Sequence, residues 1–345
     1  MNYLNIEKEI LEKLSNWKLI ISKYKTKNRK KAIIQMLTSF LPFIVIWQLL
    51  YYSLFHSIII FIILLIINAF FLVRIFIIQH DCGHNSFFKS RASNNIVGYL
   101  CSMFSFLPFK YWAKTHTFHH GHTGMLDYRT IGDLPTLTVN EFKKSNKWKR
   151  FKYRVFRMPI ITFIIAPVYY LFITTKFPFI QFNNRKKTIL ILLKDNFIIL
   201  ASNISIAIFI GWKYFLIIQS STLFVFGIIA FWFFYVQHQH EINYKQWKNN
   251  WNFLLSAIKG SSFYKLPKIF QWLTGNIGIH HIHHLNSLIP NYNLNNCLIE
   301  NPILTKYASI ISFKDSLKMI SNKLWDENQN KMISFTEFYK LYDSN

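Results

Sequence analysis

Histidine is the residue type whose number and spacing in this sequence could do chemistry. Twelve of the thirteen histidines fall in four short windows of the chain. Residues three or four positions apart share one face of a helix, with Cβ atoms about 5–6 Å apart, so this spacing lets imidazoles face a common point. Three windows carry it: His80 and His84; His116, His119 and His120; and His280, His283 and His284.

The eight imidazoles of these windows are too many for one tetrahedral zinc ion, which takes four ligands. Two metal ions that share them are the simpler arrangement, and His238 in the fourth window is a candidate ninth ligand. Imidazole binds zinc, copper, iron and nickel, so the ligand type alone leaves the metal open. His122 and His281 lie off the shared helix faces, and we expect them to be hydrogen-bonding neighbours rather than ligands.

The composition indicates a membrane protein. Hydrophobic residues make up 52% of the 345 residues, and several apolar runs are long enough to cross a bilayer. The net charge of +25 arises from Lys and Arg between and before these runs, as in cytoplasmic loops that follow the positive-inside rule, so no nucleic-acid partner is expected. Three widely separated cysteines in no CxxC pattern argue against a disulfide framework.

Four apolar runs predict membrane-spanning helices. The second run, of about 22 residues, would extend about 33 Å as a helix, enough for a hydrocarbon core of about 30 Å. Residues 96–109 and the proline-interrupted 159–175 are expected not to cross, because an extra crossing would put the histidine windows on opposite faces of the membrane. The predicted spans are about 40–55, 57–79, 196–213 and 219–236.

These spans predict an all-α integral membrane protein in three parts. Residues 1–37 form a cytosolic amphipathic segment, whose apolar side would pack on the membrane surface or on the protein's own soluble face. Residues 38–300 form the membrane domain, with a cytosolic helical cap that holds the histidines. Residues 301–345 form a cytosolic tail, expected to be an interfacial helix that ends in a loose polar segment.

Five stretches near the histidines and in the tail carry a family pattern. They read HDCGHNSFF, HTFHHGHTGMLDYRTIGDLPTLTVNEF, FYVQHQHE, GSSFYKLPKIFQWLTGNIGIHHIHHLNSLIPNYNL and LWDE. Over roughly residues 40–330 the chain resembles the membrane fatty acid desaturases, most of all the bacterial and plastid-type acyl desaturases of the delta-12 or omega-6 position. The resemblance implies that the eight window histidines and His238 are the metal ligands. The family pattern has an aromatic residue in place of His240, which we therefore expect to lie outside the ligand set.

The resemblance also implies the reaction. A desaturase of this kind uses two iron ions (Fe²⁺), molecular oxygen and two electrons to introduce a cis double bond into an acyl chain, here converting oleoyl to linoleoyl groups. The substrate would be a fatty acyl lipid whose chain rises from the membrane into a tunnel, with Trp112, Trp232 and Phe233 as candidate lining residues.

The electron donor and the location follow from the same resemblance. The sequence has neither an HPGG motif nor cysteines spaced for an iron–sulfur cluster, so electrons would come from a separate ferredoxin or cytochrome b5. A bacterial inner membrane is the expected location, or a plastid or endoplasmic reticulum membrane in a eukaryote, with the active site on the cytosolic side.

Carboxylates near the windows are expected to accept hydrogen bonds from the ring N–H groups of the ligands, which orients the imidazoles and offsets the metal charge. The alternative for each carboxylate is a helix cap or a surface ion pair. The candidates are Asp81, Asp127, Asp133 and Glu241.

Other proteins share parts of this pattern. Lipid hydroxylases and carotenoid ketolases or hydroxylases carry similar histidine windows, and product analysis separates them from a desaturase. A metal-transport or metal-binding membrane protein would place ionisable groups near the bilayer midplane, whereas the predicted spans are nearly free of them. A membrane zinc hydrolase is disfavoured because the sequence has no HExxH motif.

Overall fold

Four long apolar helices organise the part of the chain that the structure describes. The computed structural model describes residues 3–180 and 184–342; residues 1–2 and 343–345, at the ends of the predicted N-terminal segment and tail, lie outside the described residues. Within this part, the helices long and apolar enough to cross a membrane are α3 (Arg29–Ser53), α4 (Ile58–Gly83), α10 (Arg185–Ile210) and α11 (Trp212–His238). The prediction of about four spans is confirmed.

Two of these helices begin eleven residues before the predicted spans, at 29 rather than 40 and at 185 rather than 196. Both open with three consecutive basic residues, and both are capped by an asparagine, Asn28 or Asn184, whose side-chain oxygen accepts a backbone hydrogen bond. Long basic side chains at a helix end can extend to the aqueous interface. A span read from hydropathy is therefore shorter than its helix.

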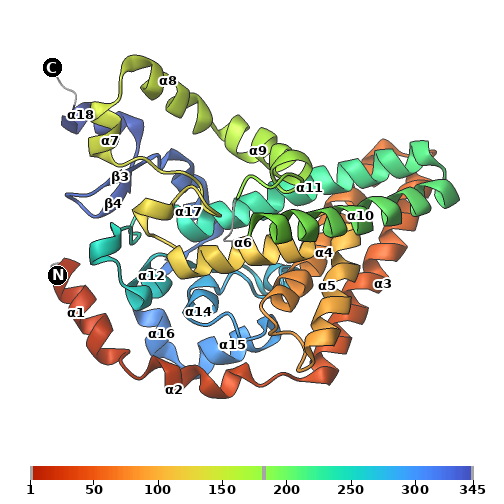
Figure 1. Ribbon diagram of the computed structural model, residues 1–345, viewed down its shortest axis with the longest axis horizontal. Helices are drawn as coiled ribbons and strands as arrows, with labels where there is room; N and C mark the ends of the chain where they lie inside the picture. Colours follow the sequence, from red (N-terminus) through yellow and green to blue (C-terminus); the bar gives the residue numbers. More distant parts are fainter. Residues whose placement is uncertain (1–2, 181–183, 343–345) are drawn as a thin grey trace.

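The long helices lie together on one side of the molecule, and a cap of shorter helices lies on the other (Figure 1). α3 packs against α4, and α4 also packs against α11. Buried side chains of α4 and α11 share one apolar core, which includes Leu72, Ile75 and Phe226. The first and last described helices, α1 (Tyr3–Lys13) and α18 (Phe335–Tyr342), both lie on the cap side (Figure 1).

A helical hairpin brings the second histidine window to the end of α4. α5 (Arg91–Ser105) packs along α4, the chain turns at Phe106, whose φ is 62°, and α6 (Phe109–His122) follows. With 15 residues, α5 is about 22 Å long, shorter than a hydrocarbon core of about 30 Å. This length agrees with the expectation that residues 96–109 do not cross the membrane.

The segment after α6 contains a bent helical pair. Helix α8 (Lys147–Phe156) and the stretch Ile161–Thr174 meet at an angle of 55°, the geometry of a broken span or of a re-entrant segment. That residues 159–175 do not cross the membrane stays a prediction. The elements of this segment are η2 (Leu126–Tyr128), α7 (Val139–Lys144), α8 (Lys147–Phe156), η3 (Ile161–Ile165), α9 (Ala166–Tyr169) and η4 (Tyr170–Thr174).

Short elements after α11 complete the cap. They are η5 (Lys248–Asn250), α12 (Phe253–Lys259), β1 (Ser262–Tyr264), α13 (Lys268–Leu273), α14 (His280–Leu285), α15 (Asn291–Glu300), α16 (Pro302–Lys306) and β2 (Ser309–Ile311). β1 and β2 pair in parallel, with Phe263 opposite Ile310. The described chain is thus helical with two small two-stranded sheets, which the all-α prediction did not include.

The N-terminal segment packs on the protein itself. It consists of α1, α2 (Trp17–Ser22) and η1 (Lys23–Lys25). Ile10, Leu14 and Ile21 are fully buried in a cluster with apolar residues of α12 and α14. Of the two predicted alternatives for this segment, the structure therefore shows packing on the protein's own face.

The tail is a folded unit, so the prediction of one interfacial helix with a loose end is wrong. After α16 and β2, the elements of the tail are α17 (Phe313–Lys318), η6 (Met319–Ser321), β3 (Leu324–Asp326), β4 (Lys331–Ile333) and α18. β3 and β4 form an antiparallel hairpin, and Leu324, Ile333 and Phe338 pack in one buried cluster with Val139 and Phe142. The turn uses Asn330 at a φ of 49°, a turn signal that helical spacing alone overlooks.

Candidate metal centre

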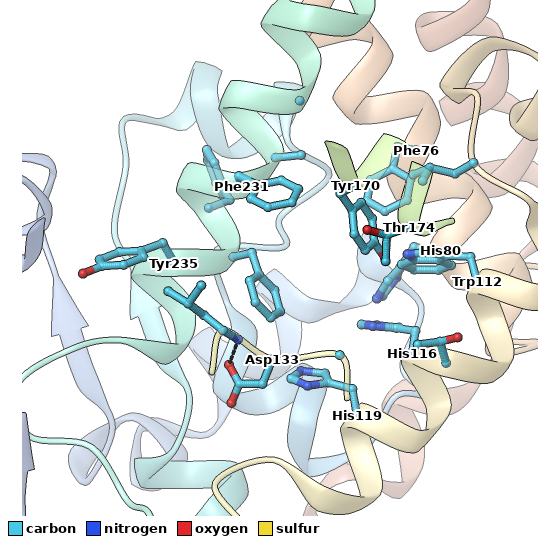
Figure 2. A pocket seen from close by; sticks show the side chains of 18 of the residues that line it. Phe76, His80, Trp112, His116, His119, Asp133, Tyr170, Thr174, Phe231 and Tyr235 are labelled. Carbon is cyan, nitrogen blue, oxygen red and sulfur yellow. Dashed lines mark hydrogen bonds between the residues drawn. The ribbon is translucent and has the colours of Figure 1, made fainter. Parts of the chain in front are cut away.

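Four elements deliver the predicted ligands to one region of the cap. His80 lies in the last turn of α4, His84 follows as its C-terminal cap, and His238 is the last residue of α11. α6 and α14 carry the other two windows. Figure 2 shows His80, His116 and His119 pointing toward one cavity. The ends of two spans therefore fix where the histidine windows meet.

The nine predicted ligands form two groups within the described residues. In each group the candidate ligand atoms lie within 4.8 Å of one another. The two groups are neighbours, since α6 and α14 contribute to both. The first group is His80, His84, His116, His120 and His283, and the second is His119, His238, His280 and His284.

Ring nitrogens within each group face one another at distances that suit a shared metal ion. In the first group, His120 Nε2 lies 3.0 Å from Nε2 of both His116 and His283. In the second group, His238 Nε2 lies 3.0 Å from His280 Nε2. Two nitrogens bound at about 2.1 Å to one ion, about 90° apart, would be separated by about 3.0 Å. The residues present therefore fit a metal ion in each group, and metal binding there is our proposal.

Burial favours the neutral imidazole, which is the form that binds a metal. Desolvation and neighbouring imidazoles hold the pKa of His84, His120 and His284 well below the usual value. Desolvation also lowers the pKa of His119 to about 4, while the charge of Asp133 raises it. These rings are therefore uncharged at neutral pH.

Asp81 makes the contact that was predicted for a carboxylate beside a ligand. Its Oδ1 lies 3.0 Å from His80 Nδ1, while its Oδ2 accepts hydrogen bonds from the backbone and side-chain nitrogens of Asn291 at 2.6 and 2.8 Å. This carboxylate is 1% exposed. Because Asp81 contacts Nδ1, Nε2 is the nitrogen of His80 that is free to bind a metal ion with the other imidazoles of the first group.

Oxygen atoms that sequence reasoning missed lie beside two further ligands. Gly260 O is 3.3 Å from His238 Nδ1, and Thr123 Oγ1 is 3.3 Å from His284 Nδ1. Asn291, which holds Asp81, was also missed, because no spacing rule connects residues 210 positions apart. Only the fixed order of helices in space brings these pairs together.

Asp133 lies in the wall of the cavity beside His119 (Figure 2). Its Oδ2 is 3.9 Å from Lys245 Nζ, and both side chains are nearly buried. Asp133 therefore balances a buried cation next to the second group, rather than accepting a hydrogen bond from a ring.

Two of the predicted carboxylate partners lie elsewhere. Asp127 is exposed and accepts the backbone N–H of Lys248 at 2.8 Å, which makes it a loop cap. Glu241 is exposed, and among the described residues its carboxylate contacts no imidazole. Solvent-facing carboxylates cannot orient a buried ring, so these positions do not support the predicted role.

The other histidines of the windows lie outside both groups. His122 Nδ1 is 2.8 Å from Phe118 O, and the two rings stack with centroids 3.9 Å apart. His240 Nε2 is 2.9 Å from Lys259 O, and His281 is fully buried. These positions agree with the expectation that none of the three is a ligand.

An apolar cavity of about 580 Å³ reaches both groups of imidazoles. This volume is within the range of about 300–1,000 Å³ that small ligands occupy in proteins. His80 and His116 of the first group, and His119 and His280 of the second, line its inner wall. A ligand in this cavity would therefore contact the surroundings of both candidate metal sites.

The remaining walls of the cavity come mainly from α4, α6, α11, the loop that contains Asp133 and the segment from η3 to η4. They are mostly apolar and aromatic, with Phe76, Tyr170 and Phe231 among the side chains in Figure 2. Trp112 and Phe233 line the cavity as expected, whereas Trp232 is not among its lining residues.

The fold is that of a helical membrane protein in which two groups of imidazoles that could hold metal ions adjoin an apolar cavity. Residues 56–308, which are 253 of the 345 residues, match the sequence profile of the family described as fatty acid desaturase. The chain therefore belongs to the fatty acid desaturase family, a family of oxidoreductases that act on lipids in membranes.

Individual relatives extend this finding. The chain is 40% identical to a fatty acid desaturase of Bacillus subtilis (strain 168) over 306 residues, 89% of this chain and 86% of the relative. It is 27% identical to an sn-1 oleoyl-lipid 12-desaturase of Anabaena variabilis, over 65% of this chain and 63% of the relative. It is 28% identical to an sn-1 acyl-lipid omega-3 desaturase (ferredoxin) of Synechocystis, over 68% of this chain and 65% of the relative.

Proposed function

We propose that the protein uses two Fe²⁺ ions and molecular oxygen to introduce a cis double bond into the acyl chain of a membrane lipid. The observation that carries this proposal is the apolar cavity whose wall contains imidazoles of both groups. In each turnover the acyl chain would lose two hydrogens, and O₂, two electrons and two protons would become two waters.

The protein's own residues would hold and position the substrate. When bound, the two irons supply the oxygen chemistry that breaks unactivated C–H bonds. Apolar and aromatic walls, including Phe76, Trp112 and Phe233, would exclude water and hold the acyl chain against the imidazole-lined wall. Asp81 would keep the His80 ring oriented through the N–H that faces the carboxylate.

The 12-position, with oleoyl as substrate and linoleoyl as product, is the regiochemistry that we propose. Its support is the sequence resemblance and the names of relatives such as the Anabaena enzyme at 27% identity. The more similar Bacillus subtilis relative, at 40% identity, is named only as a fatty acid desaturase. The position of the double bond is therefore the part of the proposal that product analysis must decide.

We further propose a separate electron donor and a cytosolic active site. The omega-3 relative of Synechocystis carries ferredoxin in its name, and a net charge of +25 would favour an acidic protein partner, with cytochrome b5 as the alternative donor. The Lys- and Arg-rich loops between the spans favour a cytosolic cap under the positive-inside rule, in a bacterial inner membrane.

Expression of the full chain in an iron-replete host with saturated and oleoyl lipids tests the proposal. Fatty acids are profiled by gas chromatography and mass spectrometry, with chemical derivatives that locate each double bond. We expect linoleate from the wild-type chain and none from His119→Ala, which removes a proposed ligand. The matched control is His122→Ala, three residues away and outside both groups, which should retain activity.

Each other outcome has a defined meaning. A new double bond at another carbon contradicts the 12-position and leaves desaturation intact. Hydroxylated or ketonic products would replace the proposal with a lipid hydroxylase or a carotenoid ketolase. Absence of any new product, with the donor co-expressed and the protein present in the membrane, contradicts desaturation itself.

A further inference from the structure

The turn between α5 and α6 is buried among the long helices, so its backbone must find polar partners inside the protein. Unpaired backbone groups are costly where water is excluded, and re-entrant backbone persists only where protein groups satisfy it. The C-terminal carbonyls of α5 and the N-terminal N–H groups of α6 both meet at this turn. The hydrogen-bond partners of these groups therefore fix the position of the α5–α6 hairpin.

Side chains of neighbouring helices satisfy the carbonyls of this turn. Asn203 Nδ2 donates to Met103 O at 3.0 Å, and Gln219 Nε2 donates to Phe104 O at 3.3 Å. In the same way, Gln79 Nε2 donates to Leu107 O at 3.0 Å, and Lys176 Nζ donates to Phe106 O. Three helices, α4, α10 and α11, and the turn after η4 thus anchor the end of α5.

α6 begins without a side-chain cap of its own. Its N-terminal capping position is Pro108, whose side chain offers no oxygen to the free N–H groups of the first turn. Asp195 of α10 supplies the missing acceptor: its Oδ2 accepts the backbone N–H of Lys110 at 2.8 Å and of Tyr111 at 3.0 Å. These are the second and third residues of α6, the N–H groups that a local cap would bind.

The charges at the turn match the helix dipoles. Asp195 is fully buried, and its carboxylate lies at the positive N-terminal end of α6. Lys176 lies at the negative C-terminal end of α5. A buried carboxylate is costly unless it is paired in this way. The contacts of Asp195 therefore serve the start of α6 rather than its own helix, α10.

We propose that Asp195 is a positioning residue for the metal centre, acting through α6. α6 supplies His116 and His120 to the first imidazole group and His119 to the second, so a shift of this helix displaces ligands of both groups. This inference rests on the proposed metal-binding function. Beyond metal binding, we infer that one carboxylate outside the cap, Asp195 of the long helix α10, sets the register and tilt of α6.

The test uses purified full-length protein in detergent, loaded anaerobically with Fe²⁺, with iron per chain measured by mass spectrometry on the monodisperse fraction. Asp195→Ala should lower iron per chain at least twofold and kcat at least tenfold. Asp195→Asn keeps a side-chain oxygen acceptor and should retain most of both. The matched control is Thr188→Val, a buried position of the same helix whose hydroxyl donates to Asn184 O within its own helix start, and it should bind iron as the wild type does.

A rescue experiment separates positioning from general stability. Pro108→Ser, added to Asp195→Ala, places a hydroxyl at the capping position of α6, where serine binds the same N–H groups. The double variant should bind more iron and have a higher kcat than Asp195→Ala. If Asp195→Ala alone is not recovered as folded protein, recovery of folded, iron-binding double variant tests the same inference. Failure of Pro108→Ser to restore either quantity, or wild-type iron and kcat in Asp195→Ala, would overturn the inference. Wild-type protein that holds no iron would instead contradict the proposed function.

Discussion

Asp81 joins the first histidine window to the segment after the last one. Its Oδ1 contacts His80 Nδ1, and its Oδ2 accepts hydrogen bonds from the two nitrogens of Asn291. All three side chains are buried. A buried carboxylate held on one side by amide nitrogens can accept a ring N–H on the other only in one orientation. The His80 ring is therefore fixed before any metal binds.

Asp81→Asn should weaken Fe²⁺ binding by about 10- to 100-fold, the usual effect of losing a partner that orients a ligand. The amide cannot accept from both sides, because its nitrogen would have to face either the ring N–H or the N–H groups of Asn291. Competition with a ferrous chelator during anaerobic titration measures the change in affinity.

Asp127→Asn is the matched control for Asp81→Asn. It makes the same chemical change at an exposed carboxylate that, among the described residues, accepts the backbone N–H of Lys248 and contacts no imidazole. We expect wild-type iron affinity from it. Equal losses in the two variants would mean that the orienting contact of Asp81 has no special effect on the metal centre.

At the residue scale, sequence spacing predicted eight of the nine imidazoles and the family resemblance added His238, but neither predicted their division into two groups. His116, His119 and His120 share one face of α6, which the i, i+3, i+4 pattern shows. The structure assigns His119 to a different group from the other two, because His238 and His280 approach α6 on that side. Contacts of this kind depend on where distant helices end, so the spacing of residues within one helix does not predict them.

At the scale of the elements, the hairpin of α5 and α6 is held by close packing as well as by hydrogen bonds. Gly98 lies in α5 directly against the ring of Phe109, the first residue of α6, and a Cβ at this glycine would overlap the ring. Phe109 is fully buried and cannot move aside freely. Any side chain at position 98 therefore pushes on the start of the helix that carries the second window.

Gly98→Ala should destabilise the protein by about 1–3 kcal/mol, the usual range for overpacking, and lower its melting temperature in detergent. The control is Gly121→Ala on α6, where a Cβ meets nothing within 4 Å. Alanine there should be neutral or stabilising by up to about 1 kcal/mol, since it favours the helix. A melting temperature for Gly98→Ala at or above that of Gly121→Ala would contradict the packing described here.

Hydropathy predicted the long helices, and the described tail shows where the same reasoning failed. Residues 313–318 are helical as their spacing suggested, but Trp325 and its neighbours form a strand that is buried against the loop after α6. The spacing of apolar residues in a short hairpin resembles that of an irregular helix. Burial against the rest of the protein decides whether such a segment forms a strand or a helix. Sequence periodicity alone does not supply that information.

At the scale of the whole molecule, the cavity is assembled from elements far apart in the sequence, and its width should control turnover. Ala230 lines it from α11. Ala230→Trp would fill part of the volume of about 580 Å³ and should lower kcat/KM for the acyl substrate at least tenfold, while iron per chain stays unchanged. Product formation in membranes and iron analysis of the same preparation measure the two effects.

Phe224→Trp on the same helix is the control, because Phe224 is exposed on the outer surface and does not line the cavity. It should keep both turnover and iron. Full turnover in Ala230→Trp would show that the acyl chain does not occupy this cavity.

The number of iron ions per chain, measured on full-length protein loaded anaerobically with Fe²⁺ and freed of loosely bound metal, tests the two-group metal centre most directly. The arrangement of the nine imidazoles predicts about two irons in the wild type, and a clear loss in His284→Ala, which removes a ring from the second group. One iron or none in the wild type, or two irons retained in His284→Ala, would contradict it.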